Sequence, residues 1–136
     1  MKTLLFAALT LISTITFAQQ KVTWEGGTPG KETSWNEPRN WSNNTVPNEF
    51  SDVIIPNVST TTFSNPVIKE GQFELNSIKI ESNGYLTVDA TAKLVVYTEV
   101  IGLANENVIL EGALLVMDEI TDSMVVFEKT KSDENQ

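Results

Sequence analysis

The chain has 136 residues, no cysteine and no histidine, and its 18 acidic and 9 basic side chains give a formal net charge of −9. The lack of histidine removes the commonest general base and transition-metal ligand, and the lack of cysteine excludes disulfides and thiol nucleophiles. The acidic balance disfavours nucleic acid and anionic membrane surfaces as partners. The length corresponds to a single domain.

Residues 1–18 have the layout of a secretory signal peptide. Lys2 precedes an apolar run that begins at Leu4, and the run ends in Thr16-Phe17-Ala18, with small residues at the minus-three and minus-one positions. The run is short and is interrupted by threonine and serine, so a membrane anchor fits less well. We therefore expect cleavage after Ala18, a secreted or cell-surface location, and no membrane insertion of the mature chain.

Residues 19–50 are predicted to form a loop-rich cap. Trp24, Trp35 and Trp41 lie among many glycine, proline and asparagine residues, a composition typical of irregular structure. Each indole gains much from burial, so we expect the three rings to pack against the rest of the domain. The alternative is that one or more rings is exposed as a stacking platform for sugars.

Residues 51–128 are predicted to form the strands of the same domain. Asp52–Ile55 is typical of a strand stopped by Pro56. From Leu75 to Met117, apolar residues come in pairs two apart, which places each pair on one face of a strand. The pairs are Ile78 and Ile80, Leu86 and Val88, and Leu94 and Val96. Asn83-Gly84 is the first expected corner, because both residues tolerate positive φ, and Thr91-Ala92 is the second.

A longer spacing indicates that the strands are stacked. Leu86 and Val88 recur 22 residues later as Val108 and Leu110. With a spacing of 21, Leu94 and Val96 recur as Leu115 and Met117, and Ala92 as Ala113. This pattern predicts a β-solenoid with a coil of about 22 residues. The alternative is an antiparallel β-sandwich or meander, because Asn-Gly between alternating strands is also a hairpin signal.

The end of the chain is predicted to hold one more strand, Met124–Phe127, followed by a polar tail over residues 129–136. An exposed edge on this last strand would invite pairing with another chain. Self-association through strand edges is therefore expected.

The opening and the first strands resemble the amino-terminal part of secreted, adhesin-like surface proteins of Bacteroidetes-type bacteria. The resemblance covers residues 22–97. It is carried in the opening by Trp24, Trp35, Asn40, Trp41, Pro47, Asp52, Val53, Ile55 and Pro56, and in the strands by Ile78, Ile80, Gly84, Leu86 and Val88. It implies a Trp-rich cap on a short right-handed parallel β-helix. Such proteins are often long and carry a carboxy-terminal sorting domain, for which this chain has no room, so attachment by that route is not expected.

A few acidic residues are candidates for catalytic or metal-binding groups. They are Asp89, Asp118, Glu119 and Asp122, together with Lys93. Asp89 and Asp118 do not share a position in the 22-residue repeat, and the spacing does not match a calcium loop. We therefore expect no catalytic residue, no cofactor and no metal site.

Two classes of function remain. The first is a noncatalytic structural or adhesive module that presents an outer face to a surface protein. That face would comprise Lys79, Glu81, Tyr85, Thr87, Lys93, Val95 and Tyr97. The second is a carbohydrate-binding module whose ligand is an extracellular glycan. Its candidate binding residues are Trp24, Trp35, Trp41, Tyr85 and Tyr97. A further alternative is a truncated remnant of a larger adhesin or β-helix polysaccharide-degrading enzyme.

Overall fold

The computed structural model describes residues 18–103, 107–118 and 123–128. Residues 1–17 of the expected signal peptide and the expected tail, residues 129–136, lie outside this part. Within it the protein is all-β, as predicted: its one helical element is a short 3-10 turn, η1 (Pro38–Asn40). No helix of the described residues is long and apolar enough to cross a membrane.

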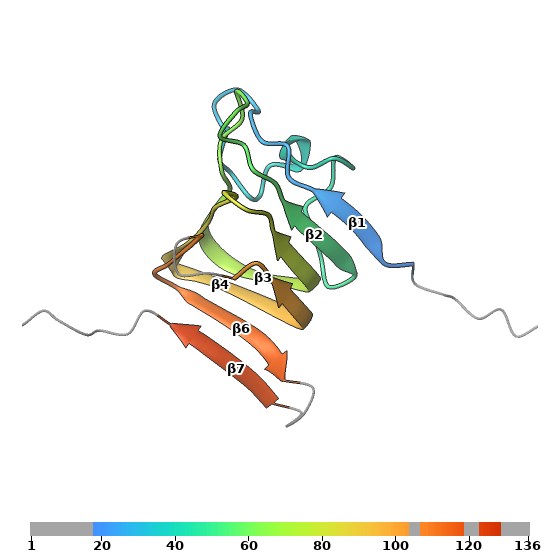
Figure 1. Cartoon of the computed structure of the whole chain (residues 1–136), viewed down its shortest axis with the longest axis vertical. Helices are drawn as coiled ribbons and strands as arrows, with labels where there is room; N and C mark the ends of the chain where they lie inside the picture. The colour runs from blue at the N-terminus through green and yellow to red at the C-terminus, as the bar shows by residue number, and fades with distance from the viewer. Residues whose placement is uncertain (1–17, 104–106, 119–122, 129–136) are drawn as a thin grey trace, which may run out of the picture.

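The strands form one mixed, open sheet (Figure 1). They are β1 (Gln20–Thr23), β2 (Ser51–Ile55), β3 (Val67–Ile80), β4 (Leu86–Ile101), β5 (Val108–Leu110), β6 (Ala113–Asp118) and β7 (Ser123–Glu128). The order is β1-β2-β3-β4-β6-β7, with β5 also beside β4. All pairings from β1 to β6 are parallel, and β6 pairs with β7 antiparallel. The antiparallel meander is therefore wrong for the chain up to β6.

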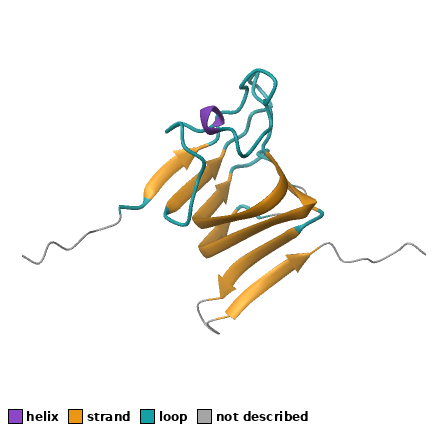
Figure 2. Cartoon of the chain, turned by 180° about the vertical axis from the view of Figure 1, so that it is seen from behind, coloured by secondary structure: helices purple, strands orange, loops and turns teal. Residues whose placement is uncertain are grey.

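The two longest strands bend as they pass round the molecule (Figure 2). β3 and β4 pair over most of their length, with register irregularities between Ile68 and Glu70 and between Leu75 and Ser77. Gly71 has φ +89°, a conformation that glycine adopts without strain. The corner expected at Thr91-Ala92 lies inside β4, opposite Glu70-Gly71. Asn83, in the other expected corner, has φ +63° as predicted.

The predicted 22-residue spacing holds for one part of the ladder. Leu86 pairs with Val108, and Val88 with Leu110. The 21-residue spacing is wrong by one residue, because Leu94 pairs with Leu114 and not with Leu115.

The shift arises at a tighter corner between β5 and β6. Val88 and Lys93 of β4 pair with Leu110 and Ala113, so the chain from β5 to β6 makes the same turn with two fewer residues. Gly112 makes this turn possible, since a Cβ there would overlap the carbonyl oxygens of Asp89 and Ala92.

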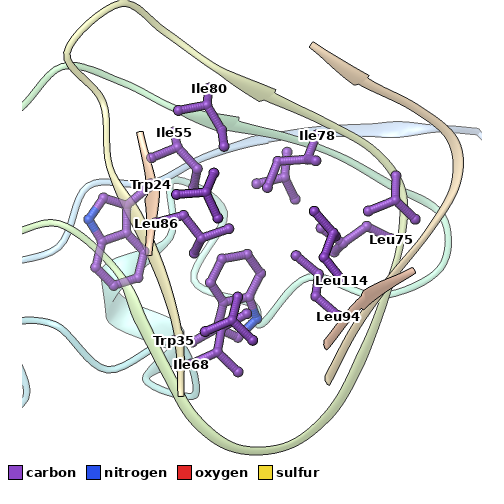
Figure 3. Packing of buried hydrophobic residues seen from close by; sticks show 14 of the residues in the cluster. Trp24, Trp35, Ile55, Ile68, Leu75, Ile78, Ile80, Leu86, Leu94 and Leu114 are labelled. Atoms are coloured by element: carbon purple, nitrogen blue, oxygen red, sulfur yellow. The ribbon is translucent and has the colours of Figure 1, made fainter. Parts of the chain in front are cut away.

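Aligned apolar side chains fill the space enclosed by the chain (Figure 3). Val22, Val53 and Ile78 face one another in register on β1, β2 and β3, and each is at most 1% exposed. All six members of the predicted pairs are buried; they are Ile78, Ile80, Leu86, Val88, Leu94 and Val96. Burying each such side chain is worth roughly 1.5–3 kcal/mol, so this stack is the main stabilising feature.

The start of the chain departs from the expected irregular cap. β1 pairs with β2 from Gln20 opposite Ser51 to Thr23 opposite Ile54. The segment is only four residues long and is followed by glycine-rich sequence, so its alternation was too short to read. Beyond β1 the segment is loop-rich, as predicted, and its loops gather at one end of β1 and β2 (Figure 1).

Candidate functional site

The three tryptophans meet in one cluster. The ring centroids of Trp24 and Trp41 are 5.0 Å apart at 79°, and those of Trp35 and Trp41 are 4.7 Å apart at 76°. These are the edge-to-face arrangements that aromatic rings favour. Trp35 also lies 6.1 Å from Phe73 of β3, which joins the cap to the ladder. No ring of the three is more than 1% exposed, so the prediction that the indoles pack down is confirmed.

Two of the indole N–H groups donate hydrogen bonds to backbone carbonyls of other residues. Trp24 Nε1 donates to the carbonyl of Ser64 at 2.7 Å, and Trp41 Nε1 donates to the carbonyl of Trp35 at 2.9 Å. Gly26 lies against Trp24, and a Cβ at this glycine would come within 2.9 Å of the indole nitrogen. With their edges bonded and their faces covered, these rings offer no stacking surface to a sugar.

Asn40 is the hydrogen-bonding centre of the cap. Its side chain is fully buried; Oδ1 accepts from the Thr28 amide at 2.9 Å, and Nδ2 donates to the carbonyls of Lys31 at 2.8 Å and Ser34 at 3.0 Å. Its own carbonyl accepts the amides of Glu25 and Gly26. One side chain thus bonds three backbone groups of the loop, and the carbonyls of Lys31 and Ser34 also accept the amides of Ser34 and Glu37.

A buried carboxylate stands at the start of η1. The Glu37 side chain is 6% exposed and binds Arg39 Nε at 2.8 Å and Lys31 Nζ at 3.0 Å. These two cations, with Arg39 the larger influence, lower the pKa of Glu37 to about 2. Glu37 therefore remains ionised and fixes the two basic side chains over the cap.

Tyr97 lies in β4, and Tyr85 lies immediately before β4. Tyr97 is half-buried, and its hydroxyl donates to Glu74 Oε2 at 2.8 Å; Gln72 Nε2 donates to the other oxygen at 2.9 Å. The Tyr97 bond, followed by the Gln72 bond, lowers the pKa of Glu74, and the same Tyr97 bond raises the pKa of the phenol. Tyr85 is 37% exposed, which makes it the most exposed of the five candidate sugar-binding residues.

The expected outer face is less uniform than its alternation suggests. Lys79 is exposed, but Val95 is only 4% exposed although it lies outside the core cluster. Val95 faces Glu74 and Leu115 on the neighbouring strands, so its outward orientation does not leave it accessible.

The considered acidic residues form no site within the described chain. Glu119 and Asp122 lie outside the described residues, and no group of three or more His, Cys, Asp or Glu that could hold a metal occurs among those described. A cavity of about 140 Å³ lies beside Trp35, between Asn36, Lys69 and Phe73. Ligand pockets usually measure roughly 300–1,000 Å³, so this space is small for an organic ligand.

Sequence reasoning singled out the tryptophans but missed the polar groups that hold them. The resemblance included Asn40 without a role in the cap, and Arg39 was noticeable only as the sole arginine, while Glu37 was not singled out. A signal was present: the sole arginine of the chain lies two residues after a glutamate in a segment with little regular structure. Such a pair is typical of a loop held by charge-assisted hydrogen bonds.

The geometry is that of a small all-β domain with a tryptophan cap. Residues 23–131 match the family described as a domain of unknown function (DUF8693), and the chain belongs to that family. No curated protein and no solved structure matches it.

Proposed function

We propose that the protein is a noncatalytic structural or adhesive module that acts outside the cell, built as a short right-handed parallel β-helix. The observation that carries this proposal is the use of the aromatic residues. All three tryptophans are buried and pack the cap against the strands; they are Trp24, Trp35 and Trp41. What remains for recognition is the outer surface of the strands.

The β-helix interpretation is supported by the pairing. Each strand from β1 to β4 pairs parallel with the next, and β4 pairs parallel with both β5 and β6. Partners lie 22 residues apart at Leu86 and Val108, and 20 apart at Leu94 and Leu114. Parallel crossovers within one sheet are almost always right-handed. The extracellular location is supported by the signal-peptide layout of residues 1–18.

A carbohydrate-binding module is the competing function, and Tyr85 is the residue that favours it. One tyrosine that is 37% exposed is a small platform for a sugar ring. The two functions therefore differ in a measurable way: an adhesive module binds through its strands, whereas a sugar module needs this ring.

The test uses the mature chain, residues 19–136, on a glycan array and in titrations with soluble polysaccharides followed by Trp fluorescence. We expect blue-shifted emission from buried indoles, no change in emission on titration, and no release of reducing sugar. Saturable glycan binding that Tyr85→Ala abolishes, but Phe63→Ala at a similarly exposed ring preserves, would replace the proposal with the carbohydrate-binding function. Release of reducing ends would overturn the noncatalytic assignment.

A further inference from the structure

Among the described residues, β7 is an edge strand without the usual protection. Edge strands of natural sheets commonly carry lysine, proline or a bulge, or are very short, which discourages pairing with other chains. β1, at the opposite edge, has four residues and an exposed lysine, Lys21. β7 has six residues, SMVVFE, with no lysine, arginine or proline. Val125, Val126 and Phe127 are 40%, 51% and 39% exposed.

These three side chains end apolar columns that begin inside the molecule. Phe127 faces Leu114, which faces Leu94, and exposure rises from 0% at Leu94 through 2% at Leu114 to 39% at Phe127. In the next column, Val125 continues the series that begins with Val96 at 0%.

On the opposite face Val126 continues a third column. It faces Leu115, which faces Val95, and Val95 is 4% exposed. Both faces of β7 are therefore apolar at the end of the sheet farthest from β1 (Figure 1). Strands with apolar residues on both faces are typically covered by other parts of a protein, so we expect this surface to be covered.

The segment that follows β7 does not suit this apolar surface. Residues 129–136 are KTKSDENQ and contain no apolar residue. A second copy of β7 offers the same apolar side chains and suits it better. We propose that two copies of the protein pair through their β7 edges, antiparallel, to form a two-fold symmetric dimer with one continuous sheet.

Backbone geometry restricts the register of this pairing. In an antiparallel pair, facing residues either both point their N–H and C=O groups at the partner or both point them away. In a symmetric pair, one residue must therefore face its own copy. If that residue is Val126, then Val125 of each copy faces Phe127 of the other, and all three apolar columns continue across the axis. Glu128 then faces Met124, and no like charges oppose each other in the strand.

The first test compares two lysine substitutions at equally exposed valine and isoleucine positions. Sedimentation of residues 19–136 over a concentration series should show a monomer–dimer equilibrium. Val126→Lys should raise the dissociation constant at least about tenfold, because each dimer would place two ammonium groups beside each other in an apolar contact. Ile109→Lys, at a position that is 53% exposed on β5, should leave it unchanged. Far-UV circular dichroism establishes that both variants are folded.

The second test fixes the register and uses the absence of native cysteine. Under mild oxidation Val126→Cys should form a covalent dimer much faster than Ile109→Cys. A mixture of Val125→Cys and Phe127→Cys should cross-link faster than either variant alone. A chain that stays monomeric at every concentration, a dimer that survives Val126→Lys, larger assemblies, or equal cross-linking at residues 126 and 109 would each overturn the proposal.

Discussion

Asn40 provides the sharpest test of how the cap is held. Replacing it with alanine removes a fully buried side chain that makes three hydrogen bonds to the backbone of Thr28, Lys31 and Ser34. The substitution leaves the Thr28 amide without its partner, whereas the carbonyls of Lys31 and Ser34 each keep a bond from a backbone amide. The ring contacts of the tryptophans are not altered directly.

The magnitude follows from the number of bonds. A typical hydrogen bond contributes about 1 kcal/mol net, and a buried group left without a partner costs roughly 1–3 kcal/mol. The Thr28 amide loses its partner, at a cost of roughly 1–3 kcal/mol, and the two carbonyls each lose one bond worth about 1 kcal/mol, so the expected loss is about 3–5 kcal/mol. This is a large part of the roughly 5–15 kcal/mol that stabilises an ordinary domain.

The assay is urea unfolding of residues 19–136, followed by Trp fluorescence, which reports directly on the cap. The matched control is Asn43→Ala, in the same segment, whose side chain makes one exposed hydrogen bond to Thr45. We expect this control to change the free energy of unfolding by no more than about 0.5 kcal/mol. Equal losses of less than about 1 kcal/mol in both variants would refute the central role of Asn40.

Three further outcomes follow from the structure. The pKa of Glu37 is lowered from 4.5 to about 2, so ionised Glu37 stabilises the fold above pH 4.5 and this contribution is lost as the pH falls towards 2. The thermal unfolding midpoint of Glu37→Gln should therefore depend less on pH between 4.5 and 2 than that of the unsubstituted protein. Identical pH profiles of the two proteins would contradict this. Gly26→Ala should lower the unfolding midpoint in urea more than Gly30→Ala, because both have positive φ but nothing lies within 4 Å of a Cβ at Gly30; equal effects would mean that backbone strain alone matters. Leu94→Ala should cost about 2–5 kcal/mol in urea unfolding, whereas Ile109→Ala, at an exposed position, should cost far less; comparable losses would contradict the assigned core.

The core was predictable because its signal is local. A period of two identifies the inward residue of a strand without any knowledge of its neighbours. Leu86 and Val88 therefore emerged correctly, and so did their partners Val108 and Leu110. The later register was not predictable from a fixed spacing, because the turn at Gly112 is shorter than the one it lies upon. When a turn is shorter, every later residue pairs at a different sequence spacing, while apolar and polar residues still alternate along the strand.

The candidate site was predictable in part. The composition of residues 19–50 indicated correctly that the three indoles would pack against the rest of the domain, but not that they would contact one another. Which polar groups would hold them was not predictable, since the partners of Asn40 are backbone atoms, and backbone positions in a loop leave no trace in sequence periodicity. The exposure of Tyr85 and the burial of Val95 depend likewise on neighbouring strands.

The pairing order also bears on how this protein can change in length. From β1 to β3 the strands pair along the sheet only with their neighbours in the sequence, and β4 pairs with β3, β5 and β6. Stability in such a stack is close to a sum over neighbouring units. Duplication of one whole coil, such as the segment from Leu86 to Asn107, would therefore repeat existing neighbour contacts without disturbing the tryptophan cap or the last hairpin. We expect a chain lengthened by such a duplicated segment to fold with its first and last strands unchanged.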